Sequence, residues 1–464
     1  MTAQTILPAN SATGAFEVSN SLRFDDGTSD NLQLTLGTPT LATKNTVSIW
    51  FKRCEIGSQD TLIFGASNAG GVYIHSDDTM RVYNANSAEL ITTRTFKDVS
   101  AWYHVVFATD TTQGTDTNRL KLYINGVQET SFSSAGWPNE DAASTLGGNT
   151  QHNIGSNNTP GNYFNGYIAE FIMVDGQALD PTSFGEFDDV TTTVWKPKKI
   201  LGALNFGDNG FYLQFKQSGT GTNASGMGAD TSGNTNHFAV NNLTAVDQSI
   251  DTCTNNFCTL NPSQIGPRNN QADSSGTFSE GNLNVLMTGS GDDFAGTIAV
   301  STGKWFYEVK LLTAANHGAG FTLLTDFTGE STVSNGIANG DFQYGSAEGG
   351  AGSKIANNGD VSVAPQNNFD DNDIIGFAFD IDGGTLKIYN NGSLDRTISS
   401  IPAGTYVPMG GDDSSTDANL AFNFGSPAYA ISSGNADGNG YGNFEYAVPS
   451  GYFAICTKNL AEYG

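Results

Sequence analysis

Positively charged residues are scarce in this chain. Its 464 residues include 20 Lys and Arg against 47 Asp and Glu, so the formal net charge at pH 7 is −27. Such a surface repels phosphate backbones and anionic lipid, and we therefore expect no nucleic-acid partner. The same surface favours neutral sugars, cationic groups or divalent metals as ligands.

Long apolar runs and an export signal are missing as well. No run approaches the roughly 18 apolar residues of a membrane span, so no membrane insertion is expected. Residues 1–14 contain no basic segment and no apolar stretch of signal length. They do not have the pattern of a secretory signal, which predicts a protein made in a cytoplasm.

Cysteine is rare, with four residues in the whole chain. Four scattered cysteines are too few for a disulfide scaffold, so buried free thiols are the favoured interpretation of Cys54, Cys253, Cys258 and Cys456. Cys253 and Cys258 are close enough in sequence for a local bridge or half of a metal site, and that alternative stays open.

Glycine and aromatic residues are abundant instead, with 56 Gly, 29 Phe and 16 Tyr. Glycine-rich turn sequences predict many short strands rather than long helices, and the aromatic side chains supply apolar surface for a folded core. A chain of this length is expected to hold two or three domains. The predicted fold class is all-β.

One short sequence occurs twice, as LKLYING at 120–126 and as LKIYNNG at 386–392. In each copy apolar residues alternate with Lys and Tyr, which is the period of a strand with one buried face. The closing Asn-Gly pair supplies the two residues with positive φ that a type I′ hairpin turn requires. The repeat therefore predicts two hairpins of the same kind in two β-sandwiches.

Alternating apolar segments separated by turn residues predict strands in two groups. The first group comprises 22–24, 46–52, 62–64, 71–75, 80–83, 103–109, 120–125 and 167–174. The second group comprises 283–287, 297–300, 304–311, 320–324, 374–380, 386–389 and 420–424. After the first group, Asp180 followed by Pro181 predicts a short helical turn with Asp180 as its cap.

The two groups predict two antiparallel β-sandwiches in tandem, joined by an extended Gly/Asn-rich connector with recurring aromatic residues. The connector begins with a basic cluster, Lys196, Lys198 and Lys199, which we expect to fasten it to an acidic domain. The predicted boundaries are 1–15 for an N-terminal arm, 16–190 for the first sandwich, 191–262 for the connector, 263–430 for the second sandwich and 431–464 for a C-terminal docking segment.

Several segments of the first sandwich match a known family in order and spacing. They are SLRF at 21–24, VSIWFK at 47–52, WYHVV at 102–106, the first hairpin and GYIAEF at 166–171. Together they resemble a laminin-G-like domain, which has the concanavalin A-like lectin fold. This resemblance covers most of residues 16–190 and implies a binding module.

The second sandwich resembles a different family of the same architecture. GKWFYEV at 303–309, DIIGFAFD at 373–380, the second hairpin and AFNFG at 421–425 are similar to a SPRY domain. SPRY domains are also two-sheet sandwiches, which explains why one hairpin sequence appears twice.

The arrangement as a whole is similar to tail-fibre or appendage proteins of marine bacteriophages. Connector pieces such as WKPKKI and TNNFCTLNP and the ending PSGYFAICTKNL carry this resemblance. It implies a location in the virion, with other virion proteins and a host-surface glycan or protein as partners. It also implies a homo-oligomer. A trimer fits the resemblance, although no heptad pattern is present to enforce one.

The sequence offers little for catalysis, and no enzyme activity is expected. A glycoside hydrolase needs two carboxylates a few ångströms apart, and its usual form on this fold is Glu-x-Asp-x-x-Glu. The nearest segment, EFDDVT at 186–191, lacks the last carboxylate. No nucleophile elbow, HExxH or phosphate loop appears, and the five histidines are scattered. We therefore predict no catalytic residues.

Calcium is the one cofactor considered, because laminin-G-like domains often carry it at the sandwich rim. Asp110 and Asp116, in the loop DTTQGTDTN before the first hairpin, are the preferred candidates for oxygen ligands. Segments that start at Asp230 and Asn435 copy only the first half of a calcium loop. Turns are the favoured interpretation of both.

Candidate ligand-binding residues lie in turn-rich segments of both sandwiches. Trp137 and Tyr163 are aromatics that either stack on a sugar or anchor their loops to the sandwich. In the second sandwich the loop GGDDSSTD offers Asp412, Asp413 and Asp417. Specificity depends on which of these loops are exposed.

The favoured function is a non-enzymatic virion protein, a tail fibre or fibre-like appendage that attaches to a glycan or protein of the host surface. Weak contacts in each copy would add up through display on one particle. One alternative is a capsid decoration or connector protein with no receptor. A second alternative is a depolymerase that degrades cell-surface polysaccharide.

Overall fold

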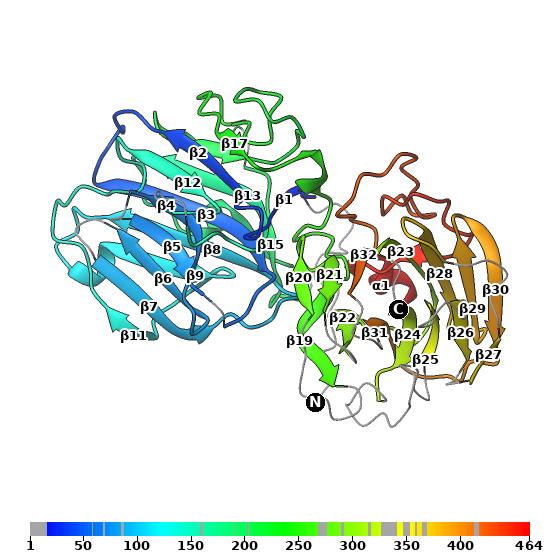
Figure 1. The fold of residues 1–464 in the computed structure, drawn as a ribbon. Coiled ribbons are helices and arrows are strands. Elements are labelled where there is room, and N and C mark those ends of the chain that lie inside the picture. Colours follow the sequence, from blue (N-terminus) through cyan, green and yellow to red (C-terminus); the bar gives the residue numbers. More distant parts are fainter. Residues whose placement is uncertain are drawn as a thin grey trace. The chain divides into compact units, whose positions relative to one another are not determined.

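The computed structural model describes residues 16–57, 59–67, 70–84, 88–157, 161–189, 191–200, 202, 204–267, 276–288, 292–313, 317–325, 341–346, 353–357, 360–363, 369–412 and 417–464. They divide into two compact units, the first ending at Asn255 and the second beginning at Asn256 (Figure 1). Strands dominate both units, and the all-β prediction is confirmed. The α-helix of the described residues, α1 (Thr457–Tyr463), has seven residues. No described helix has the length and apolar character that crossing a membrane requires.

The first unit is a sandwich of two large sheets (Figure 1). Sheet A has the order β10 (Val127–Gln128), β9 (Leu120–Ile124), β8 (Trp102–Asp110), β3 (Lys44–Arg53), β13 (Gly166–Asp175), β1 (Ser21–Phe24) and β18 (Gln248–Ser249), with β16 (Phe211–Leu213) paired to β13. Sheet B has the order β11 (Phe132–Ala135), β7 (Ala88–Thr95), β6 (Thr79–Asn84), β5 (Gly70–Ile74), β4 (Thr61–Ala66), β12 (Gln151–Ile154), β2 (Asn31–Thr35) and β17 (Ala239–Asn241). Strands from residues 21–249 thus build one sandwich.

The core of the first unit lies between sheets A and B. Alternate residues of each strand enter it, as in β9, where Leu120, Leu122 and Ile124 are at most 2% exposed. After β13 the chain makes the predicted helical turn, η2 (Pro181–Ser183), in which the carboxylate of Asp180 accepts a hydrogen bond from the backbone N–H of Thr182. Local sequence chemistry therefore fixes these elements.

The segments after residue 183 cover the outer face of sheet A. Phe184, Ile200, Phe206 and Tyr212 form one apolar cluster with residues of β8 and β13. Further along the chain, Asp251 is buried in an ion pair 2.9 Å long with Lys52 of β3. The outer face of sheet A is therefore occupied by the chain itself.

The predicted connector, 191–262, lies for the most part within the first unit. Its strands β16, β17 and β18 pair with β13, β2 and β1. The first lysine of the basic cluster belongs to β15 (Trp195–Pro197), which pairs with β14 (Gly185–Phe187). Lys196 Nζ lies 3.3 Å from Asp188 and 3.7 Å from Glu186, so this lysine pairs with acidic residues just before it in the chain.

The second unit is also a sandwich of two large sheets. One has the order β19 (Leu260–Pro267), β22 (Asp292–Gly296), β31 (Tyr406–Asp412), β24 (His317–Leu323), β25 (Asp341–Ser346), β26 (Ser353–Asn357) and β27 (Asp360–Val363). The other has the order β20 (Thr277–Ser279), β21 (Asn284–Met287), β32 (Ala418–Asn423), β23 (Lys304–Thr313), β28 (Ile374–Asp380), β29 (Thr385–Asn390) and β30 (Ser393–Ser399), with β33 (Phe453–Ala454) parallel to β23.

One predicted strand of this unit is wrong. The alternating run 297–300 follows β22 instead of forming a strand, and Val300 makes only an isolated bridge to Tyr406. Ile298 and Val300 are buried in the second core at 2% and 3% exposure. Burial of two alternate side chains in an irregular segment produced the same sequence pattern as a strand.

The two hairpins have the predicted turns and the same register. Asn125 and Gly126 have φ of 49° and 79°, and Asn391 and Gly392 have φ of 48° and 77°. In each unit the first leucine of the repeat lies opposite the second-to-last residue of the preceding strand, with Leu120 facing Thr109 and Leu386 facing Phe379. The repeated sequence therefore occupies equivalent places in the two sandwiches.

The C-terminal residues cover the outer face of the sheet that contains β23. Phe444 packs edge-on against Phe306 at 5.1 Å. The carboxylate of Glu308 accepts hydrogen bonds from the backbone of Glu445 and Tyr446 at 3.0 and 2.8 Å. Each sandwich thus carries a later segment of its own unit on one sheet.

Candidate ligand-binding site

Two of the loops that carry predicted site residues meet at one end of the first sandwich. The loop after β8 holds Asp110 and Asp116, and the loop after β11 holds Trp137. Arg119 joins them, because its guanidinium donates hydrogen bonds to the carbonyls of Gln113 and Pro138 at 2.7 and 3.1 Å. We call residues 36–43, 110–119 and 136–148 the loop rim.

The two predicted calcium ligands differ in their surroundings. Asp110 lies 3.0 Å from Lys44 Nζ, and its oxygens also accept hydrogen bonds from Thr112 and Gln113. Burial raises the pKa of Asp110, but these partners outweigh it and hold the pKa below its usual value. Asp116 is exposed at the start of a short 3₁₀ turn. Within the described ranges, no three His, Cys, Asp or Glu side chains gather in a way that could hold a metal ion.

The two predicted aromatic residues lie at opposite ends of the sandwich. Trp137 is half-buried and packs against the main core, on the loop rim. Tyr163 is also half-buried, but it precedes β13, whose first residue, Gly166, pairs with Arg53 at the far end of β3. A single small ligand therefore does not contact both rings.

The predicted acidic loop of the second sandwich is only partly described. Asp412 is the last residue of β31, with a backbone partner in His317, and its side chain lies outside the described residues. Asp413 lies outside them altogether. Asp417 is exposed just before β32. The role of these three residues stays a prediction.

The two calcium-loop-like segments are turns built on one carboxylate each. Asp437 accepts hydrogen bonds from the backbone of Asn439, Tyr441 and Ala454, all at 2.9 or 3.0 Å. Asp230 receives the backbone N–H groups of Tyr212, Ser232 and Asn236. Because the oxygens are saturated by donors of the chain itself, the interpretation of both segments as turns is supported by their geometry.

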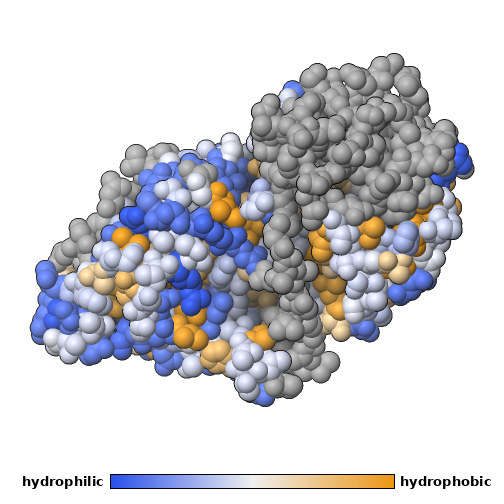
Figure 2. All heavy atoms as spheres, turned by 90° about the horizontal axis from the view of Figure 1, so that it is seen from below, coloured by the Kyte–Doolittle hydropathy of each residue, from blue (hydrophilic) through white to orange (hydrophobic). Residues whose placement is uncertain are grey.

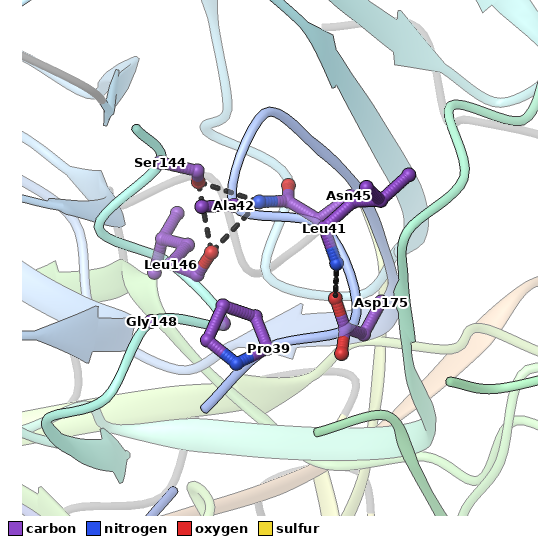
Figure 3. A pocket seen from close by; sticks show the side chains of 9 residues that line it. Pro39, Leu41, Ala42, Asn45, Ser144, Leu146, Gly148 and Asp175 are labelled. Atoms are coloured by element: carbon purple, nitrogen blue, oxygen red, sulfur yellow. Dashed lines mark hydrogen bonds between the residues drawn. The ribbon is translucent and has the colours of Figure 1, made fainter. Parts of the chain in front are cut away.

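A small pocket beside the loop rim shows how its loops are held (Figure 3). The side-chain amide of Asn45 donates to Ser144 and to the carbonyl of Leu146, and Asp175 accepts the backbone N–H of Thr40 at 2.6 Å. The pocket has no room for a water molecule. Asn45 is 3% exposed and its Oδ1 has no hydrogen-bond partner. The hydrogen bonds of Asn45 and Asp175 therefore join the loops of the rim, and the pocket between them is too small for a ligand.

A serine and a histidine on sheet A form a pair that superficially resembles a catalytic dyad. Ser48 Oγ lies 2.8 Å from His104 Nε2, and Trp195 Nε1 donates to His104 Nδ1 at 2.8 Å. Since Nδ1 accepts the hydrogen bond from Trp195, the neutral ring carries its own proton on Nε2, facing the serine. A base for Ser48 needs that nitrogen free. Burial also lowers the pKa of His104 to about 3, and the pair serves packing.

One carboxylic acid is buried under the covering segments of sheet A. Glu170 occupies a bulge in β13 with φ of 45°, is 5% exposed and is hydrogen-bonded by the hydroxyl of Tyr212. Burial raises the pKa of Glu170 to about 7. A glycosidase needs a second carboxyl group 5 to 10 Å away and an open cleft. Glu170 is instead buried against Tyr212 of β16, the strand that pairs with β13.

All four cysteines of the chain are buried thiols that form no disulfide. Burial raises the pKa of Cys54 to about 12 and that of Cys253 well above its usual value, so neither ionises near neutral pH. The interpretation as buried free thiols is confirmed, and Cys253 and Cys258 do not form a bridge.

Comparison with known proteins agrees with this geometry. Residues 26–183 match the family model described as the concanavalin A-like lectin/glucanases superfamily. The first sandwich is laminin-G-like. The chain has no match among the curated proteins.

Solved structures resemble the chain over about a third to a half of its length. The SPRY domain of human HERC1 has 15% identity and a TM-score of 0.27, covering 35% of this chain and 96% of its own. A putative carbohydrate binding protein from Bacteroides ovatus has 14% identity and a TM-score of 0.33, covering 49% and 59%. A heptameric pentraxin from Limulus polyphemus has 17% identity and a TM-score of 0.27, covering 36% and 80%.

Proposed function

We propose that this chain is a non-enzymatic virion protein of a bacteriophage, a tail fibre or fibre-like appendage that binds glycan on the host surface through its first sandwich. The match of residues 26–183 to the concanavalin A-like lectin/glucanases superfamily supports the binding role of the first sandwich. The virion location rests on the resemblance of the connector and C-terminal segments to phage appendage proteins. Proteins of this architecture place their binding residues on loops and open sheet faces, and the first unit offers both.

The covered face of sheet A argues against hydrolysis on that sheet. A glucanase would need its substrate to reach a pair of carboxylates on an open sheet face. Here that face carries the buried ion pair of Lys52 and Asp251 and the closed-off acid Glu170. A polymer has no access to either.

Attachment would be multivalent. The acidic surface gives each copy little electrostatic attraction to anionic envelopes, so each contact is expected to be weak. Display of several copies on one particle raises the effective concentration of the second contact and hence the avidity. Assembly with other virion proteins and with copies of this chain provides that display.

Adsorption competition tests the proposal. Recombinant full chain in its native oligomer is incubated with host cells before phage is added, and free phage is counted over time. We expect dose-dependent binding and slower phage adsorption. Folded protein that neither binds nor competes would leave a capsid decoration or connector role instead. Time-dependent shortening of purified host polysaccharide would contradict the non-enzymatic assignment.

A chelator arm addresses calcium. If Asp110 and Asp116 rearrange around a bound ion, EDTA will reduce binding and added Ca²⁺ will restore it. The ion pair between Asp110 and Lys44 predicts no such effect, because a cation at Asp110 must first displace the lysine.

A further inference from the structure

Sheet B has an outer face that the described parts of the segments covering sheet A do not occupy. Four partly exposed side chains from adjacent strands gather there, Tyr73 of β5, Arg81 and Tyr83 of β6 and Glu89 of β7. The register places Tyr73 opposite Arg81 and Tyr83 opposite Glu89. We call these four residues the tyrosine face.

The two tyrosine rings form a corner. Their centroids are 5.6 Å apart and their planes meet at 81°. The ring edge of Tyr83 passes over Gly71, with the hydroxyl 2.9 Å from the place a Cβ would take, so only glycine admits the ring there. Burial raises the pKa of both phenols, and both hydroxyls therefore stay protonated donors at neutral pH.

Polar groups of both signs border the corner. The Glu89 carboxylate accepts a long hydrogen bond of 3.4 Å from the Tyr73 hydroxyl and lies 3.9 Å from an Arg81 nitrogen. The Arg81 guanidinium lies over the Tyr73 ring at 5.8 Å. Arg81 offsets the charge of Glu89, but the carboxylate of Asp60 also acts on the Tyr73 hydroxyl. The patch therefore keeps the acidic character of a chain whose net charge is −27.

The tyrosine face adjoins the loop rim. The backbone N–H of Gly136, next to Trp137, donates to the Glu89 carbonyl at 2.7 Å. Asn84, which follows Tyr83, receives the backbone N–H groups of Thr145 and Leu146 on its side-chain oxygen. The face is thus anchored to the loops on one side and to a continuous sheet beneath.

We propose that the tyrosine face is a binding site for neutral hexose units of a glycan. A sugar ring has an apolar face of C–H groups and a rim of hydroxyls. The two tyrosine rings offer aromatic surface to the C–H face of the sugar. Glu89 offers an acceptor, and Arg81 offers donors, to the sugar hydroxyls. The acidic character of the patch and of the surrounding surface favours an uncharged sugar over a uronic acid.

Figure 2 shows one side of the first unit, on which apolar residues form small separate patches in a largely polar surface. An apolar partner would require a continuous patch of several hundred Å². The site rests on the proposed function, since it names where and what the first sandwich binds.

Glycan binding by single variants tests the site. The full chain and its Y83A, Y73A and E89Q variants are titrated with purified host envelope polysaccharide, neutral hexose oligosaccharides and uronic-acid oligosaccharides. We expect Y83A and Y73A to weaken binding of the neutral sugars at least tenfold, and E89Q severalfold. Uronic-acid oligosaccharides should bind the wild type at least tenfold more weakly than the neutral sugars.

Two controls keep the outcomes apart. Y389A removes a half-buried tyrosine from the second unit and should leave affinity unchanged. W137A removes the aromatic of the loop rim. If the wild type binds and Y83A, folded as judged by its melting temperature, binds equally well, the site is wrong while glycan binding stands. Loss on W137A alone would move the site to the loop rim. A wild type that binds no glycan overturns both proposals.

Discussion

At the scale of single residues, buried acids make the stability of the first unit depend on pH. Glu170 has a folded-state pKa of about 7, raised by burial, against 4.5 when exposed. A raised pKa means that the folded state holds the proton more tightly. The stabilisation is complete below pH 4.5 and is lost as the pH rises through 7.

The variant E170Q should remove this dependence. A shift of this size corresponds to about 3 kcal/mol of unfolding free energy between pH 4.5 and 8. We measure the free energy of unfolding by denaturant at both pH values. Between pH 4.5 and pH 8 it should fall by roughly that amount more in the wild type than in E170Q. Parallel pH profiles for the two proteins would show that Glu170 is ionised in the folded state.

The hairpin glycines give a second prediction at this scale. A Cβ on Gly126 would overlap the indole of Trp195, and one on Gly392 would lie 2.5 Å from the Tyr446 ring. Both positions also have positive φ. We expect G126A and G392A each to destabilise its own unit by about 2–4 kcal/mol. The control G114A, where no atom lies within 4 Å, should change unfolding by less than about 1 kcal/mol.

At the scale of elements, buried ion pairs fasten the covering segment to sheet A. Lys52 and Asp251 are 0% and 1% exposed, and Asp251 also receives the indole N–H of Trp102 at 3.2 Å. Removal of one partner leaves a buried charge without compensation. D251A is therefore expected to cost about 3–5 kcal/mol of unfolding free energy.

A partly exposed pair provides the matched comparison. Lys44 and Asp110 are 32% and 13% exposed in their side chains, and K44A should cost at most about 1 kcal/mol. In the double variant K52M/D251A, loss of both charges should recover part of the cost of D251A. Equal losses for D251A and K44A would mean that the covering segment is not held by the buried pair.

Elements differed in how far the sequence predicted them. The hairpins, the helical turn at Asp180 and the strands with strict alternation followed from local chemistry, because their signals lie within a few residues. The docking of β16 onto β13 did not, since the partners are about 40 residues apart and only the folded chain brings Tyr212 to Glu170. The strand prediction for 297–300 was wrong because two alternate buried side chains in an irregular segment give the same sequence pattern as a strand.

The candidate site was less predictable still. The segments of β5 and β6 were expected as strands, but only the structure shows that Tyr73 and Tyr83 share an outer face. Trp137 and Tyr163 look alike in sequence, yet they lie at opposite ends of the sandwich. Which loops meet depends on Arg119 and Asn84, whose contacts span 19 to 62 residues. No local pattern marks such contacts.

At the scale of the whole molecule, the chain consists of two compact units with separate cores. Each core is closed by segments of its own unit. We therefore expect two thermal unfolding transitions, one per unit. In calorimetry, G126A should lower the transition temperature of the first unit only, and G392A that of the second unit only. The two variants thus assign each transition to its unit.

The most direct test of the account is the thermal unfolding of the full chain with and without purified host envelope polysaccharide. Ligand that binds the folded first unit must stabilise it by mass action. The account predicts that the transition lowered by G126A rises with polysaccharide concentration, while the transition lowered by G392A stays in place. A rise of only the second transition, or of neither, would contradict glycan binding by the first sandwich.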